Sequence, residues 1–118
     1  MSDVINLTST NFDEVLDDSS KPLLVDLWAT WCAPCRQLVP RLEELSRQYA
    51  GRLRIAKVDV DAEPMLAQKF AVRSIPTLVF VHNEEIIETI VGALPLAQLA
   101  EAAERVLAAV SATMANPR

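Results

Sequence analysis

Both cysteines of this chain lie in one short stretch, LWATWCAPCRQLVP, which spans residues 27–40. Cys32 and Cys35 are separated by only two residues. A disulfide that staples a secreted fold usually closes a longer loop, and cysteines that merely fill a core have no reason to share one turn. A chain of 118 residues that is 51% hydrophobic buries enough apolar surface to fold without a disulfide or a metal. The cysteine pair is therefore available for chemistry.

The hydrophobic pattern on either side of the cysteines alternates between strand and helix periods. Strands are predicted at residues 4–8, 22–28, 52–60, 77–82 and 86–92, and helices at residues 12–18, 34–50, 61–70 and from residue 95 onward. The order βαβαβαββα predicts an α/β fold whose mixed sheet has three parallel strands and a final antiparallel hairpin. No repeat or linker interrupts it. We expect one domain over residues 1–112 and a flexible C-terminal tail at residues 113–118.

The cysteines stand where a predicted strand ends and a helix begins. With Cys32 at the helix cap and Cys35 in the first turn, their Cβ atoms would lie roughly 5–6 Å apart, close to the ~3.5–4.5 Å of a disulfide. The pair can thus switch between dithiol and disulfide without unfolding. The positive end of the helix favours the thiolate of Cys32, whereas Cys35 is more sheltered. This predicts that Cys32 attacks a disulfide and Cys35 resolves the mixed disulfide.

Charge and the N-terminal sequence narrow the classes of partner. The net charge is −5, and no block of five like charges occurs, which argues against nucleic acid as a partner. The segment MSDVINLTST lacks the basic and apolar regions of an export signal, and no apolar run approaches the length of a membrane span. We expect a cytoplasmic protein with no membrane partner. In that compartment a lone CxxC indicates redox chemistry or a metal.

A zinc site is the main alternative for the cysteine pair. Zinc needs four ligands, and the chain offers two cysteines and His82, which we expect to be a solvated residue at a strand end. We therefore predict no metal, although a zinc site shared between two chains stays open. Asp26 and Lys57 both interrupt apolar strands. For Lys57 a surface position is a reasonable alternative, whereas Asp26 is expected to be buried.

Four motifs link the chain to a known family. VDLWATWCAPC at 25–35, KVDVD at 57–61, SIPT at 74–77 and VGAL at 91–94 occur in the order and at the spacing of thioredoxins. The chain resembles the thioredoxin family over nearly its full length. The resemblance implies the thioredoxin fold and a monomeric reductase of disulfide-containing proteins. It also implies no cofactor beyond the Cys32–Cys35 disulfide, and re-reduction by a flavin- and NADPH-dependent thioredoxin reductase.

The resemblance further implies roles for individual residues. Asp26 takes the proton of Cys35, and Lys57 tunes that carboxyl group. Pro76 is expected to be cis and to lie against the cysteine pair. The rim on which an extended substrate segment docks is implied to consist of Trp31, Ile75, Pro76, Gly92 and Ala93. Structural residues near the site are Trp28, Pro34 and Pro40, and Pro40 should bend the helix.

Three positions depart from the family pattern. Ala33 stands between the cysteines in place of a glycine, which bears on the redox potential and on the fit to a reductase. Ser74 and Glu84 also replace glycines, and at Glu84 we expect a loose or differently shaped hairpin turn. Two other functions remain open: a binding subunit of the same fold whose redox turnover is incidental, and an oxidant or isomerase.

Overall fold

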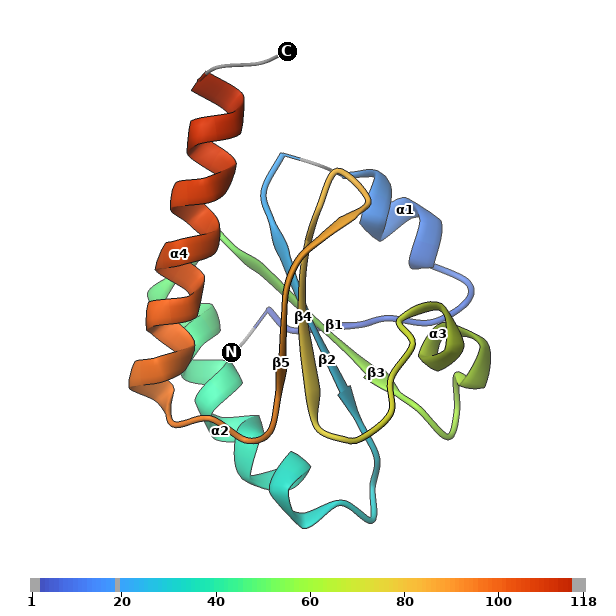
Figure 1. Cartoon of the computed structure of the whole chain (residues 1–118). Coiled ribbons are helices and arrows are strands. Elements are labelled where there is room, and N and C mark those ends of the chain that lie inside the picture. Colours follow the sequence, from blue (N-terminus) through green and yellow to red (C-terminus); the bar gives the residue numbers. More distant parts are fainter. Residues whose placement is uncertain (1–2, 19, 116–118) are drawn as a thin grey trace.

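The computed structural model describes residues 3–18 and 20–115, and the elements in them follow the predicted order βαβαβαββα (Figure 1). The strands are β1 (Ile5–Asn6), β2 (Leu23–Trp28), β3 (Arg54–Asp59), β4 (Thr77–His82) and β5 (Glu85–Val91). The helices are α1 (Phe12–Asp17), α2 (Ala33–Gln48), α3 (Pro64–Lys69) and α4 (Leu96–Ala115). β1 is shorter than expected, but the amide of Leu7 still donates to the carbonyl oxygen of Lys57 at 2.9 Å and prolongs the pairing with β3.

The five strands form one mixed sheet in the order β1-β3-β2-β4-β5. β3 runs parallel to both β1 and β2, whereas β4 is antiparallel to β2 and β5 is antiparallel to β4. The predicted combination of parallel strands and a final hairpin is therefore confirmed. β2 lies at the centre, which explains its nearly unbroken apolar sequence.

Helices cover both faces of the sheet (Figure 1). Alternate residues of β2 point to opposite faces: Leu24 packs in a cluster with side chains of α2 and α4, whereas Leu23 and Val25 pack with those of α1 and α3. The next residue on the Leu24 face is Asp26. A carboxyl group thus enters the layer between the sheet and α2, where apolar side chains otherwise pack.

Helix α2 carries the cysteines at its start and one apolar stripe along its length. Leu38, Leu42 and Leu45 recur at helical spacing and are buried against the sheet. Pro40 lies in the interior of the helix on its exposed side, so its ring points away from the core while its missing N–H removes one bond of the helix. The stripe fixes α2 on the sheet, and thereby fixes the position of its N-terminus.

The turn of the last hairpin is tight, and the expectation of a looser turn is wrong. His82 pairs directly with Glu85, so only Asn83 and Glu84 form the loop. Both have positive φ, 54° and 63°, as a type I′ turn requires. Asn83 adopts this conformation readily, and the pairing of the flanking strands holds Glu84 in it without a glycine. The register then shifts between Phe80 and Val81, which marks a bulge in the hairpin.

His82 and the end of α4 also differ from the sequence-based expectations. His82 is 7% exposed and lines a cavity with Ala109, Val110 and Thr113, so it is buried beneath α4 rather than solvated. α4 continues to Ala115, beyond the boundary predicted at residue 112. The sequence has no glycine or proline between Pro95 and Pro117, so neither residue stops the helix earlier. Residues 116–118 of the predicted tail lie outside the described residues. Among the described helices, none has the length and apolar character needed to cross a membrane.

Candidate active site

The two cysteines form a disulfide at the N-terminus of α2. Cys32 is the N-cap residue with extended backbone angles, and Cys35 lies in the first turn. Their Cα atoms are 5.2 Å apart, and the amide of Cys35 donates to the Sγ of Cys32 at 3.2 Å. Pro34 sits between them in the first turn, where its fixed φ suits the helix and its missing N–H costs nothing. The sequence alone thus located the cap and the turn correctly.

The two sulfur-bearing residues are both largely covered. Cys32 is 5% exposed and Cys35 is 1% exposed, while Ala33 and Pro34 between them are exposed. The amide of Cys35, which donates to the Sγ of Cys32, and the positive end of the helix dipole lie beside this sulfur. This environment stabilises a negative charge on its sulfur, as thiol-disulfide exchange requires of the attacking group.

A second loop lies against the cysteine pair. The Ile75–Pro76 peptide bond is cis, as the resemblance implied. Ile75 packs against the cluster of Ala29, Cys32 and Cys35. The carbonyl oxygen of the buried Pro76 accepts a hydrogen bond from the amide of Gly92 at 2.9 Å. The fold therefore brings two of the predicted rim segments, residues 75–76 and 92–93, side by side.

Trp31 is the most exposed predicted rim residue. It is 67% exposed, and its Nε1 donates to Oδ2 of Asp61 at 2.9 Å. Asp61 follows β3, and its amide in turn bonds to Oδ1 of Asp59 at 3.0 Å. The carboxylate of Asp61 holds the indole ring beside Cys32. Sequence reasoning missed this residue, although it lies in the KVDVD motif.

Trp28 takes the structural position expected of it. It is half-buried and packs against the cluster that contains Cys32 and Cys35. The Nζ of Lys57 lies 5.5 Å from the centre of its ring, within the range of a cation–π contact. Trp28 thus contacts both the cysteine cluster and the lysine cation.

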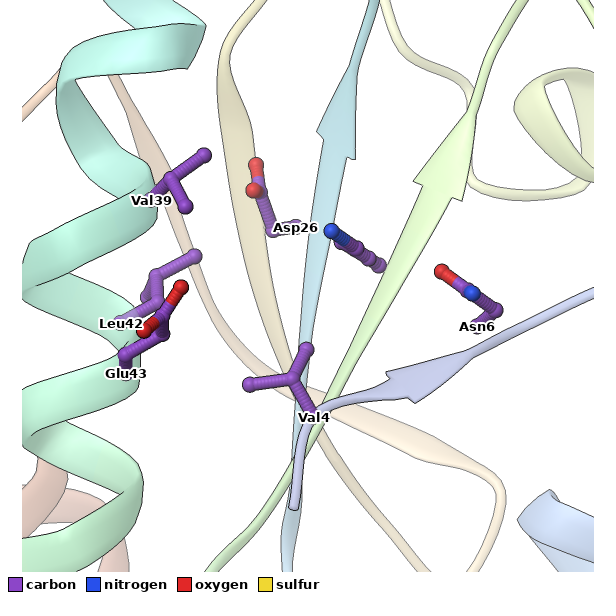
Figure 2. A pocket seen from close by; sticks show the side chains of 7 residues that line it. Val4, Asn6, Asp26, Val39, Leu42 and Glu43 are labelled. Atoms are coloured by element: carbon purple, nitrogen blue, oxygen red, sulfur yellow. The ribbon is translucent and has the colours of Figure 1, made fainter. Parts of the chain in front are cut away.

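Asp26 is buried beside a small cavity. The carboxyl group is 2% exposed, and within the described part of the chain its Oδ1 has no hydrogen-bond partner. Figure 2 shows it directed towards Val39, on the helix turn that follows the cysteines. The cavity has a volume of about 140 Å³ and is lined by Val4, Asn6, Asp26, Val39, Leu42, Glu43 and Lys57.

Burial raises the pKa of Asp26 from its usual value to about 7, and the positive charge of Lys57 partly opposes the rise. A carboxyl group with a pKa near neutrality exchanges its proton readily at cellular pH. Lys57 itself is half-buried, so the surface alternative for this residue does not hold. Both sequence-predicted charges face the same cavity.

No metal site emerges from the described residues. Within residues 3–18 and 20–115, no three side chains of the His, Cys, Asp and Glu types gather in a way that could hold a metal ion. His82, the third candidate ligand, lies at the far end of β4, away from Thr77 and the cis-proline loop. The cysteines are paired with each other instead.

The chain matches known proteins over most of its length. The family model described as Thioredoxin matches residues 3–105. The chain is 43% identical to a thioredoxin of Haemophilus influenzae over 100 residues, which cover 85% of this chain and 94% of that protein. It is 44% identical to a thioredoxin of Staphylococcus haemolyticus over 102 residues, which cover 86% of this chain and 96% of that protein. It is 37% identical to thioredoxin 1 of Nostoc over 105 residues, which cover 89% of this chain and 98% of that protein.

Proposed function

The chain belongs to the thioredoxin family and is a protein-disulfide reductase, and from this premise we propose how its own residues carry the reaction. The observation that supports the proposal most strongly is the Cys32–Cys35 disulfide at the N-terminus of α2. It corresponds to the oxidised form of the protein, which is the state that remains after a substrate has been reduced. The active form is the dithiol.

In the first step the thiolate of Cys32 attacks one sulfur of a disulfide in the target protein. A bond forms between Cys32 and that sulfur as the target disulfide breaks, and the second target sulfur leaves as a thiolate that takes up a proton. The amides at the start of α2 and the helix dipole favour the charged form of Cys32 before the attack.

In the second step Cys35 resolves the mixed disulfide. Cys35 loses its proton, its sulfur attacks Cys32, and the remaining target sulfur leaves. The target gains two electrons and two protons, and the protein becomes the Cys32–Cys35 disulfide. Asp26 accepts the proton of Cys35. Its pKa of about 7 suits this task, because a base works best near the pH at which it operates. Lys57 sets how readily Asp26 ionises.

The substrate docks on a rim formed by Trp31, Ile75, Pro76, Gly92 and Ala93. An extended target segment would form backbone hydrogen bonds beside the cis-proline, and the apolar side chains of the rim accept many sequences. Val91 next to this rim is 63% exposed, and Trp31 is 67% exposed, so apolar surface is available for such contacts.

The cycle closes outside this chain. We propose that an NADPH-dependent flavoprotein reductase returns two electrons to the disulfide, that no cofactor binds to this chain, and that the protein works as a cytoplasmic monomer. One assay tests the proposal: NADPH oxidation in the presence of insulin, a thioredoxin reductase and this protein. Turnover that needs all three components and is lost in Cys32→Ser supports it. A chain that does not reduce insulin contradicts it.

Two measurements separate this function from its alternatives. A binding subunit would keep its affinity for a partner after both cysteines are changed to serine, whereas a reductase loses its activity. An oxidant would have a redox potential well above that of the cytosolic thiol pool. The redox potential of a reductase would be close to that of the pool or below it.

A further inference from the structure

We propose that Arg41 is a positioning residue that fixes the Gly92–Leu94 segment of the docking rim against helix α2. This inference rests on the proposed function, because it concerns how the same site holds a protein substrate. Arg41 lies on the helix that begins at the cysteines, yet it contacts a segment more than 50 positions further along the chain.

The contact consists of two hydrogen bonds. Nη1 of Arg41 donates to the carbonyl oxygen of Ala93 and to that of Leu94, each at 3.0 Å. The side chain is half-buried. In the described part of the chain Arg41 forms no ion pair, so its charge is directed at these carbonyls and is not shared with a carboxylate. Hydrogen bonds from a charged donor are stronger than those between neutral groups.

The segment that Arg41 holds has little other support from the backbone. It connects β5 to α4 and belongs to no strand or helix. Among residues 3–18 and 20–115, no backbone amide donates to the carbonyl of Ala93 or Leu94. The amide of Gly92 bonds to Pro76, and Gly92 has a φ of 116°, a conformation that glycine adopts easily. The hydrogen bond to Pro76 therefore holds one end of the segment and those from Arg41 hold the other, where Ala93 and Leu94 also pack against the core.

These contacts connect the three parts of the site. The cysteines start α2, Arg41 leaves the same helix about two turns later, and Gly92 leads on to the cis-proline loop. In a helix a side chain leans towards the N-terminus, so Arg41 is directed to the end of α2 that bears the cysteines. The distance between the two borders of the rim, Pro76 and Ala93, then depends on Arg41.

A fixed rim matters only for substrates that touch it. An extended protein segment must contact both borders, and a mobile border must be ordered at each binding event, which weakens binding. A small disulfide reacts at Cys32 without covering the rim. Loss of Arg41 should therefore weaken the binding of protein disulfides and leave the chemistry at sulfur unchanged.

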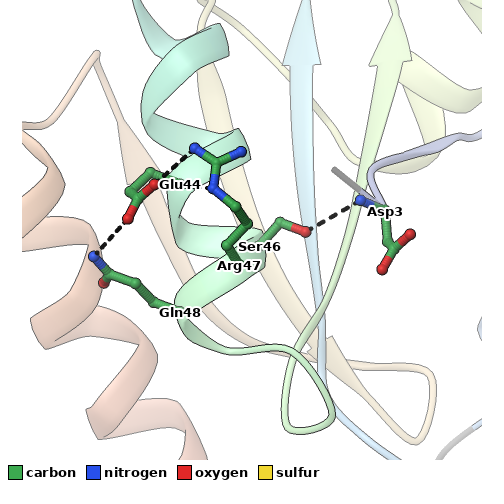
Figure 3. A network of polar contacts seen from close by, with 5 residues as sticks. All are labelled: Asp3, Glu44, Ser46, Arg47 and Gln48. Carbon is green, nitrogen blue, oxygen red and sulfur yellow. Dashed lines mark hydrogen bonds and ion pairs between the residues drawn. The ribbon is translucent and has the colours of Figure 1, made fainter. Parts of the chain in front are cut away.

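The test compares Arg41→Met, Arg41→Lys and a control, Arg47→Met, in the full chain. Arg47 lies on the same helix, but it pairs with Glu44 at 2.6 Å on the exposed face (Figure 3). Each reduced protein is mixed with rising concentrations of insulin or of cystine, quenched with acid, and its remaining thiols are alkylated and counted by mass spectrometry. Half-saturation concentration and limiting rate are thus obtained separately. Hydrogen exchange of the Gly92 amide, which donates to the carbonyl oxygen of Pro76, is measured in parallel.

For Arg41→Met we expect a half-saturation concentration for insulin about 5- to 10-fold higher, an unchanged limiting rate, and cystine reduction within twofold of the parent, in line with the loss of two charge-assisted hydrogen bonds. Exchange at the Gly92 amide should become faster, because the segment that it begins has lost its second attachment. The half-saturation concentration of Arg41→Lys should lie between those of Arg41→Met and the parent. If Arg41→Met does not fold, Arg41→Lys provides the comparison with the parent. Arg47→Met should match the parent.

The inference is overturned if Arg41→Met or Arg41→Lys binds insulin like the parent, or if insulin and cystine reduction fall together. Its failure is distinct from failure of the proposed function, since in the latter case the parent protein itself would not reduce insulin.

Discussion

Asp26 and Lys57 are register partners on the adjacent parallel strands β2 and β3, yet within the described residues their side chains form no ion pair. Both face the same cavity of about 140 Å³, and Nζ of Lys57 lies over the ring of Trp28 instead. The carboxyl group therefore has a cation nearby but no direct partner. The effect of burial on the pKa of Asp26 therefore exceeds the opposing effect of the Lys57 charge, and the pKa rises to about 7.

The raised pKa makes the stability of the protein depend on pH. The pKa of an aspartic acid in the unfolded chain is about 3.9, so between about pH 4 and 7 the folded state binds the extra proton. The contribution of Asp26 to the free energy of unfolding should be largest below this window, fall as the pH rises from about 4 through about 7, and stay constant above it. Asp26→Asn cannot ionise, so it should be more stable than the parent at pH 8 by roughly 2–4 kcal/mol.

Urea unfolding of the oxidised protein from pH 4 to 9 measures this difference. Asp13→Asn, which removes an exposed carboxylate on α1, controls for the change in net charge. The same Asp26→Asn variant should resolve a mixed disulfide more slowly, because it lacks the carboxyl group that we propose as the proton acceptor of Cys35. A variant that is less stable than the parent at pH 8, or that resolves at the parental rate, would remove Asp26 from the mechanism.

Lys57→Met should raise the pKa of Asp26 above about 7, since the positive charge is what opposes the effect of burial. The titration is followed by NMR on the side-chain carboxyl carbon of Asp26. Lys69→Met is a matched control, because Lys69 also lies over an aromatic ring, that of Phe12, at 4.9 Å, but lines no cavity with Asp26. An unchanged or lower Asp26 pKa in Lys57→Met would mean that the lysine charge does not reach the carboxyl group.

Glu84→Gly should stabilise the fold by about 1 kcal/mol, because Glu84 has a φ of 63° in the hairpin turn and glycine adopts this conformation without strain. Glu85→Gly is the control: the neighbouring residue is also an exposed glutamate, but it begins the regular strand β5 and should lose stability as glycine. Urea unfolding of both variants provides the comparison. Equal losses in the two would show that positive φ at Glu84 carries no cost.

The order of elements and the position of the cysteines could be predicted because they depend on local signals. Apolar periodicity marks α2 and the central strands, and the helix N-terminus follows from Cys32 and Pro34. The cis bond before Pro76 followed only from the resemblance. The burial of Asp26 was predicted because a charge in an apolar central strand has nowhere else to go.

The errors arise where contacts between distant segments decide the outcome. The position of His82 at a strand end predicts exposure, but α4 packs over this residue from about 30 positions later in the chain. The bond from Trp31 to Asp61 and the bonds from Arg41 to Ala93 and Leu94 join residues 30 to 53 positions apart. No periodicity or local motif encodes such a pair. The tight turn at Glu84 was missed because strand pairing overrode the residue's own preference.

The two sulfurs have different tasks in the proposed reaction, and one trapping experiment tests this assignment most directly. Reduced Cys35→Ser and reduced Cys32→Ser are each incubated with a protein disulfide, and the covalent complexes are quantified on a non-reducing gel. If Cys32 attacks and Cys35 resolves, Cys35→Ser accumulates a stable mixed disulfide and Cys32→Ser traps almost nothing. Equal trapping by both variants, or more by Cys32→Ser, would contradict the assignment of Cys32 as the attacking sulfur.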